Sequence, residues 1–201
     1  MYKIYDCYLN LFDLLFEKIK EIRTNLNLSQ EVFSKILGWS KKNKILSILP
    51  FSKEYKTVNT ILYLLKNNKL CETSLMKHLF AVDFYNCKEN KEAITNLKYA
   101  HLPYGPVVDS RNALYNFLIK NDYIKIEIND VSTDFTTDKD FDKKLFTKEE
   151  LNSLKTIKDK FKGYSASELS DWSHSFKGYI DTKNGEIIDY KYAKYLDIDS
   201  I

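Results

Sequence analysis

A helical pattern runs through Leu75-Met-Lys-His-Leu-Phe-Ala-Val-Asp-Phe84. Its large apolar residues recur at the spacing of an α-helix, and they are Leu75, Met76, Leu79, Phe80 and Phe84. Thr73 precedes this stretch and is a residue type that caps helix N-termini well. We therefore predict a helix that is capped by Thr73.

Helical patterns continue on both sides of this stretch. Upstream, apolar residues at helical spacing predict a helix from about Thr57 to Asn67. Downstream, two capping boxes each predict the start of a helix, and they pair Thr147 with Glu150 and Ser165 with Glu168.

One segment has the pattern of a β-strand. In residues 123–128, Ile124, Ile126 and Ile128 alternate with more polar residues, so they share one face. Residues 101–108 hold two of the three prolines and one glycine, which predicts an ordered loop and not a helix. The fold class that we predict is mainly α, a helical domain with a small β wing or hairpin.

A short helical region, residues 1–52, is expected to precede this domain, which we place at residues 57–201. The boundary falls in the polar stretch Phe51–Lys56, directly after Pro50. Within the first region, Asn27-Leu-Ser-Gln-Glu-Val-Phe-Ser-Lys-Ile-Leu-Gly-Trp-Ser40 resembles the first half of a helix-turn-helix. Such motifs place an aliphatic residue where Lys44 stands, so we describe the region as degenerate.

DNA binding by this region is left open. Its candidate DNA-contacting residues are Ser29, Gln30, Lys41, Lys42 and Lys44. The whole chain is weakly equipped for specific DNA reading, because its net charge is only +3 and all but two of its 31 basic residues are Lys. Arg is the usual bidentate reader of guanine.

Composition also bears on the compartment. The three cysteines are widely spaced and odd in number, which favours a reducing environment over a disulfide framework. Asp6 and Asp13 interrupt the apolar stretch that a signal peptide would need, and no window is apolar enough for a membrane span. We therefore expect a cytoplasmic protein without membrane association.

Catalytic and metal-binding patterns are weak. His78, His101 and His174 stand far apart, and no nucleophile elbow or phosphate-binding glycine motif occurs. A zinc site from His101, His174 and Cys87 is not indicated by their spacing. We assign no catalytic residue, no metal ligand and no cofactor, and we predict that the protein is not an enzyme.

Four stretches together resemble one known family. They are Leu75–Phe84, Leu97-Lys-Tyr-Ala-His-Leu-Pro-Tyr-Gly-Pro-Val107, Phe146-Thr-Lys-Glu-Glu-Leu-Asn-Ser-Leu154 and Ser165-Ala-Ser-Glu-Leu-Ser-Asp-Trp-Ser-His174. With residues 185–188 and 190–193, they resemble the Panacea domain, the family of the antitoxin SocA and of phage-associated GepA-like proteins. The resemblance extends from Thr57 to about Leu196, and a helix-turn-helix before a Panacea domain is a recurrent pairing in this family.

The resemblance implies an antitoxin that neutralises a cognate protein toxin by direct binding, and it implies no catalysis. Members pair with unrelated toxins, and some deliver the toxin to a protease. The residues that match the family motif, as structural or partner-binding positions, are Asp83, Tyr99, His101, Tyr104, Gly105, Pro106, Trp172 and His174. We expect Tyr104, Gly105 and Pro106 to fix a turn, with His101 and Asp83 hydrogen-bonded beneath it.

Other partners and functions stay open at this point. Operator DNA, a protease and a second copy of the chain in a homo-oligomer are further candidate partners. The alternative functions are a DNA-binding repressor that uses the helix-turn-helix, and a phage-encoded factor that counteracts a host defence system.

Overall fold

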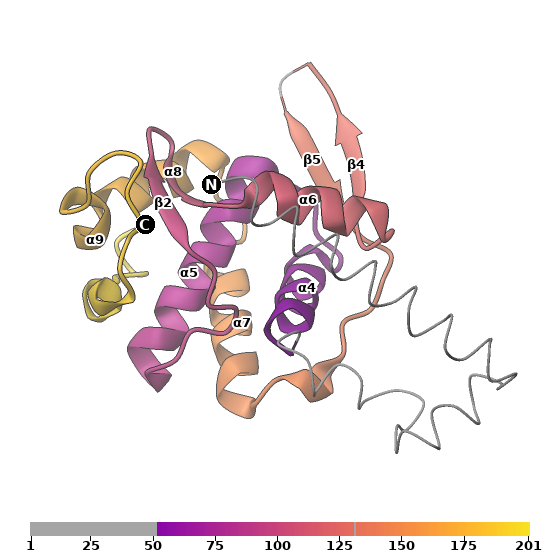
Figure 1. The fold of residues 1–201 in the computed structure, drawn as a ribbon, viewed down its shortest axis with the longest axis horizontal. Coiled ribbons are helices and arrows are strands. Elements are labelled where there is room, and N and C mark those ends of the chain that lie inside the picture. The colour runs from indigo at the N-terminus through magenta and orange to yellow at the C-terminus, as the bar shows by residue number, and fades with distance from the viewer. Residues whose placement is uncertain (1–51, 131) are drawn as a thin grey trace, which may run out of the picture. The chain divides into compact units, whose positions relative to one another are not determined.

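The computed structural model describes residues 52–130 and 132–201. Its elements in chain order are α4 (Ser52–Leu65), β1 (Leu70–Cys71), α5 (Glu72–Asn90), β2 (Tyr99–Leu102), β3 (Gly105–Val108), α6 (Arg111–Lys120), β4 (Lys125–Ile128), β5 (Thr133–Thr136), η1 (Lys143–Leu145), α7 (Lys148–Lys160), α8 (Ala166–Ser175), α9 (Lys177–Ile180) and η2 (Tyr190–Tyr195). This arrangement confirms the mainly α fold with a small β component (Figure 1).

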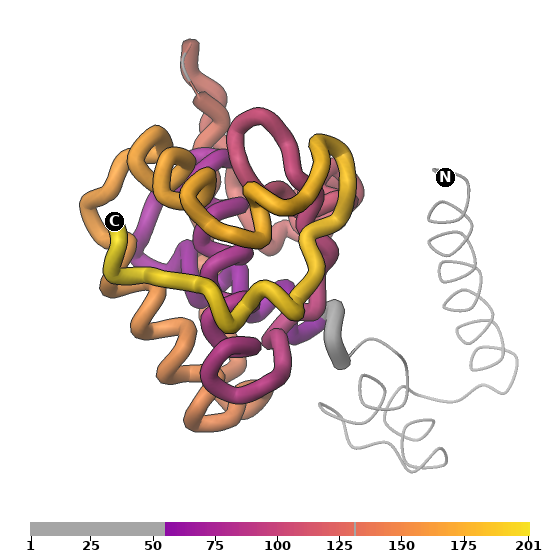
Figure 2. The backbone as a smooth tube through the Cα atoms, turned by 90° about the vertical axis from the view of Figure 1, so that its left-hand side faces the viewer, coloured from indigo at the N-terminus to yellow at the C-terminus, as the bar shows by residue number. Residues whose placement is uncertain are grey.

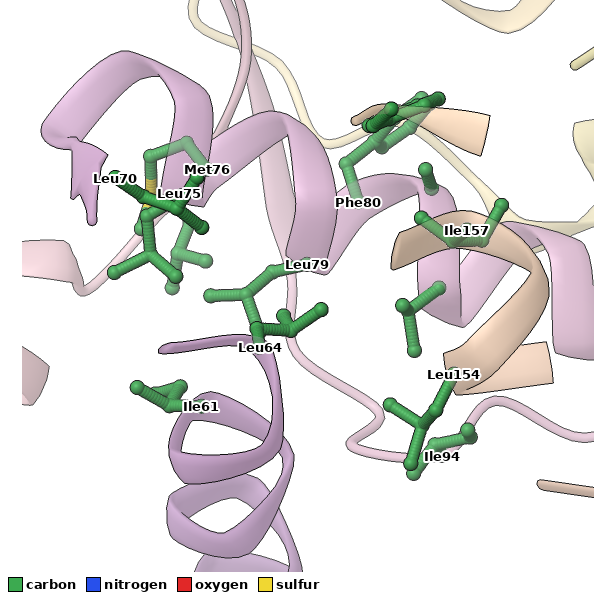
Figure 3. Packing of buried hydrophobic residues seen from close by; sticks show 14 of the residues in the cluster. Ile61, Leu64, Leu70, Leu75, Met76, Leu79, Phe80, Ile94, Leu154 and Ile157 are labelled. Atoms are coloured by element: carbon green, nitrogen blue, oxygen red, sulfur yellow. The ribbon is translucent and has the colours of Figure 1, made fainter. Parts of the chain in front are cut away.

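Helix α5 is the centre of the domain. Its buried residues occur on every side, which is typical of a helix enclosed by its neighbours. It packs against α7, α8, β3 and η2. Figure 3 shows Leu79 and Phe80 of α5 among apolar side chains that include Leu64 of α4 and Ile157 of α7. These side chains make α5 the scaffold on which the other elements are placed.

The start of α5 differs from our prediction. The N-cap is Cys71, not Thr73, and its ψ of 166° is that of an extended residue. Leu70 and Cys71 pair with Phe135 and Asp134 of β5, so the chain stays extended until this sheet ends. A tertiary contact that the local sequence does not reveal therefore sets the first residue of the helix.

Both capping boxes are confirmed. Thr147 caps α7, and its side chain accepts from the Glu150 N–H while the Glu150 carboxylate accepts from the Thr147 N–H. Ser165 and Glu168 do the same at the start of α8. Helix α4 is also present, but it begins at Ser52, five residues before the predicted start.

The strands form two small antiparallel sheets. One has the order β1-β5-β4, and the predicted strand over residues 123–128 is its outer strand β4. The other consists of β2 and β3, joined at one edge by a bridge between Ala100 and Ile187. Residues 101–108 are thus non-helical as predicted, but they lie in a hairpin and not in a loop. Only Pro103 and Tyr104 lie between the last paired residues, Leu102 and Gly105, so β2 and β3 form a tight hairpin.

The C-terminal segment, yellow in Figure 2, runs across one face of the helices. The carbonyl of Leu196 accepts from Lys88 of α5, and the carbonyl of Asp197 accepts from the indole N–H of Trp172 of α8. Asp199 pairs with Lys160 of α7 at 3.0 Å. These contacts hold three helices together from one side.

The N-terminal region and the absence of a membrane span were also predicted from the sequence. The degenerate helix-turn-helix and its candidate DNA contacts, Ser29, Gln30, Lys41, Lys42 and Lys44, lie outside the described residues and stay predictions. Within residues 52–130 and 132–201, no helix combines the length and the apolar character that a membrane crossing requires.

Candidate functional site

The motif that includes Tyr104 forms the turn of the β2–β3 hairpin. Leu102 pairs with Gly105 across the two strands, which leaves Pro103 and Tyr104 as the two residues of the turn. We call residues 102–106 the Tyr104 turn. Gly105 and Pro106 are buried, whereas Tyr104 is 77% exposed. Gly105 and Pro106 therefore anchor the turn in the protein interior, and Tyr104 presents its aromatic ring to solvent.

Only glycine fits at position 105. Its φ of +92° lies in a region that side chains disfavour. A Cβ atom there would lie 2.3 Å from the Ser173 hydroxyl oxygen and 2.8 Å from Cε of Lys77. The absence of a side chain thus allows the hairpin to lie directly on α5 and α8.

Hydrogen bonds from three helices fix the Tyr104 turn. The Lys77 ammonium of α5 donates to the Pro106 carbonyl at 3.2 Å. The Ser170 hydroxyl of α8 donates to the Tyr104 carbonyl at 2.9 Å, and the Tyr179 hydroxyl of α9 donates to the Leu102 carbonyl at 2.8 Å. Because each bond ends on a backbone carbonyl, the conformation of the turn does not depend on its exposed side chain.

Lys77 is an unusual residue for a helix centre, because it is fully buried. Burial disfavours the charged ammonium and lowers the pKa of Lys77 to about 8. The same positive charge, after burial itself, contributes to lowering the pKa of His174. The Tyr104 turn is therefore held partly by a cation that the surrounding core destabilises.

We expect Lys77→Met to remove a pH dependence of stability. Between pH 8 and the ordinary lysine value of 10.5, the unfolded chain holds a proton that the folded chain has lost. Wild-type stability should therefore rise with pH there, by up to about 1.4 kcal/mol per unit relative to the variant. Urea unfolding at pH 8 and pH 10 measures this difference. Lys155→Met, at an exposed position of α7, should keep the wild-type profile, and parallel profiles for Lys77→Met would contradict the assignment.

The histidines of the motif stack on one tyrosine. The Tyr179 ring lies 3.7 Å from His101 and 4.8 Å from His174, measured between ring centroids, and both pairs are nearly parallel. Nδ1 of His101 is 2.7 Å from the Thr182 carbonyl oxygen, whereas Nε2 of His174 is buried without a hydrogen-bond partner among the described residues. This stack positions α9 against the hairpin.

Ser173 and His78 also have structural contacts. The Ser173 hydroxyl donates to the Ser170 carbonyl at 2.7 Å, within α8. His78 is a buried core residue with Nδ1 2.8 Å from the Ser74 carbonyl oxygen, and burial lowers its pKa to about 4. In the part of the chain that is described, no three His, Cys, Asp or Glu side chains gather as a metal site.

Asp83 forms a second cluster on α5, away from the Tyr104 turn. Its fully buried carboxyl accepts from the Thr95 N–H and hydroxyl, from Tyr99 at 2.8 Å and from Tyr190 at 3.1 Å. Burial raises the pKa of Asp83, and these hydrogen bonds partly offset the rise. The expectation that Asp83 and His101 bond beneath the turn is therefore wrong, because Lys77 occupies that place and the partners of both residues lie elsewhere.

The remaining motif residue, Trp172, is a core residue. Its ring packs edge-on against Phe161 and Phe80. Five residues that hold the motif in place were not predicted from the sequence, and they are Lys77, Thr95, Ser170, Tyr179 and Tyr190. The sequence gives one signal that Lys77 is buried. Apolar residues stand on both sides of Lys77 and occupy every face of the helix, which leaves no solvent-facing side for it.

These features define a mainly helical domain with a rigid aromatic hairpin, built on one buried helix. The family model for the antitoxin SocA-like Panacea domain matches residues 75–179, more than half of the chain. The chain belongs to this family. The match begins in α5 and ends at Tyr179, so it contains the Tyr104 turn and each side chain that fixes it. No curated protein and no solved structure matches the chain.

Proposed function

We propose that this protein is an antitoxin that neutralises a cognate protein toxin by direct binding, and that the Tyr104 turn contacts the toxin. The observation that carries the proposal is the 77% exposed Tyr104 ring on a turn fixed by three hydrogen bonds. Tyrosine is enriched among the residues that dominate binding energy. A backbone that is already fixed loses little entropy on binding.

Further exposed apolar residues lie on elements joined to β2. Ile180 is 65% exposed on α9, which bonds to β2 through Tyr179 and Leu102. Ile187 is 42% exposed and forms the bridge to Ala100 of β2. Exposed apolar side chains on adjoining elements are typical of protein-binding surfaces. They support a protein partner over a small ligand.

Co-expression with the product of the adjacent gene tests the proposal. We expect the neighbour to arrest growth alone, and this protein to restore growth and to co-purify with it. A harmless neighbour that does not co-purify would contradict neutralisation of an adjacent toxin.

Tyr104→Ala tests the contact itself. The variant should weaken toxin binding by about tenfold or more, which corresponds to the loss of an interface hot spot of roughly 2 kcal/mol. Its free energy of unfolding should change by less than about 0.5 kcal/mol, because the ring is exposed. Titration calorimetry and urea unfolding give the two quantities. Tyr195→Ala on η2 truncates another partly exposed tyrosine and is the matched control; equal effects of both variants on affinity would argue against the Tyr104 turn.

A further inference from the structure

Strand β4 has an open edge. It is the last strand in the order β1-β5-β4, and among the described elements it packs extensively only against β5. Figure 1 shows the β4–β5 hairpin extending past α6. Open strand edges expose backbone hydrogen-bonding groups and tend to pair with another strand.

The register identifies the free backbone groups. The Asn129 N–H donates to the Ser132 carbonyl at 3.0 Å, and Glu127 and Ile128 pair with Asp134 and Thr133. Antiparallel strands alternate hydrogen-bonded and non-hydrogen-bonded pairs. The backbone of Glu127 thus points to β5, and that of Ile128 points away from it.

By the same alternation, Lys125 bonds to β5 and Ile126 faces outward. The open edge therefore presents the N–H and C=O groups of Ile126 and Ile128.

The side chains of β4 separate into two faces. Ile124 is buried, Ile126 is half-buried and Ile128 is 81% exposed on one face. Lys125 and Glu127 lie on the other. An exposed isoleucine at an open edge is unfavourable unless a further strand covers it.

We propose that two copies of this chain pair antiparallel through their β4 edges, with the two-fold axis at Ile126. This register pairs the open backbone groups of Ile126 in the two copies. It places Lys125 opposite Glu127 of the second copy twice. The exposed Ile128 lies diagonally across from the half-buried Ile126 of the second copy, on the same face, so the two isoleucines can contact each other.

The charges favour this register over the two adjacent ones, in which the axis lies one residue away. An axis at Glu127 would oppose the two Glu127 carboxylates, and an axis at Lys125 would oppose the two Lys125 ammonium groups. Like charges directly opposite each other across strands are destabilising, and opposite charges stabilise. This charge complementarity of β4 with itself favours a second copy over a foreign strand.

Existing ion pairs do not prevent this arrangement. Lys125 pairs with Asp138, and Glu127 pairs with Lys69, within one chain. All four side chains are substantially exposed, and exposed pairs contribute little to stability. The inference is independent of the proposed function, since the Tyr104 turn belongs to the other sheet.

Analytical ultracentrifugation of the full chain over a range of concentrations tests the proposal. We expect a monomer–dimer equilibrium in the wild type. Glu127→Lys and Lys125→Glu should each weaken the dimer by about tenfold or more, because two attractive pairs become repulsive. The double variant should recover dimerisation, although it lacks both intrachain pairs.

A mixture of the two single variants gives the sharpest result. One variant presents only lysines and the other only glutamates, so the heterodimer should form more tightly than either homodimer. Thermal unfolding of each variant verifies that it is folded. A monomeric wild type, or a dimer that neither single variant weakens, would overturn the proposal. If an unrelated strand-forming peptide bound the single variants while the complementary variant formed no heterodimer with them, the β4 edge would be assigned to a foreign partner instead.

Discussion

We expect Gly105→Ala to lower the free energy of unfolding by about 3 kcal/mol or more. A left-handed backbone costs a residue with a side chain about 1–2 kcal/mol, and overpacking of a filled core adds about 1–3 kcal/mol. Both apply here, because φ is +92° and the new methyl group would overlap the Ser173 hydroxyl and the Lys77 side chain. Both neighbours are buried, so neither has free space to move into. Urea unfolding measures the loss.

The chain offers a matched control in Gly163. Its φ is +90°, but a Cβ atom there would meet nothing within 4 Å. Gly163→Ala should therefore cost only the backbone strain, about 1–2 kcal/mol. Adding Ser173→Ala to Gly105→Ala removes the nearest atom and should recover part of the loss, a non-additive effect. Equal losses for Gly105→Ala and Gly163→Ala would refute the close approach of the turn to α5 and α8.

The second large effect is expected for Asp83→Ala, with a loss of about 3–5 kcal/mol. The substitution removes the shared acceptor of the Thr95 N–H and of the Thr95 and Tyr99 hydroxyls in a fully buried site, whereas the Tyr190 hydroxyl keeps the Leu97 carbonyl as an acceptor at 2.7 Å. Buried donors left without partners cost about 1–3 kcal/mol each, although relaxation makes such costs less than additive. Denaturant unfolding at pH 7 measures the loss.

Asp83→Asn is the informative companion variant. It keeps the volume and one acceptor oxygen, so its loss should be smaller, and a loss below 1 kcal/mol for Asp83→Ala would contradict the role of the carboxyl. Burial raises the pKa of Asp83 in the folded state. At a pH between 3.8 and that raised pKa, the folded state retains a proton that the unfolded state has released. Wild-type stability relative to Asp83→Asn should therefore increase as the pH falls through that raised pKa towards the unfolded value near 3.8.

Local sequence signals predicted the parts of the fold that local physics determines. The boxes at Thr147 and Ser165 are correct to the residue, because each is a hydrogen-bonding pattern within four residues. The strand predicted over residues 123–128 contains β4, Lys125–Ile128, and the prediction rests on alternation alone. The β2–β3 hairpin was not predicted, since its pairing depends on the packing of Gly105 against α5 and α8.

The candidate site could be predicted only in part. The motif residues around Tyr104 were found, but the side chains that hold them were not. Lys77 would ordinarily be placed on a solvent-facing side of its helix. Its burial follows from the enclosure of α5 on all sides, for which the apolar run around Lys77 is the one signal in the sequence. Likewise, Tyr190 reaches Asp83 across 107 residues of sequence, a distance over which spacing carries no information.

That long separation has a consequence for the timing of synthesis. Chains grow at roughly 5–20 residues per second, so on the order of 5–20 s pass between translation of Asp83 and translation of Tyr190. During this interval α5 has a carboxyl that lacks its last hydroxyl partner, and β2 lacks its neighbour at Ile187. Contacts so distant in sequence also form slowly. The domain therefore cannot complete its fold before Tyr190 is translated, and a chain that stops before Tyr190 lacks the contacts that close it.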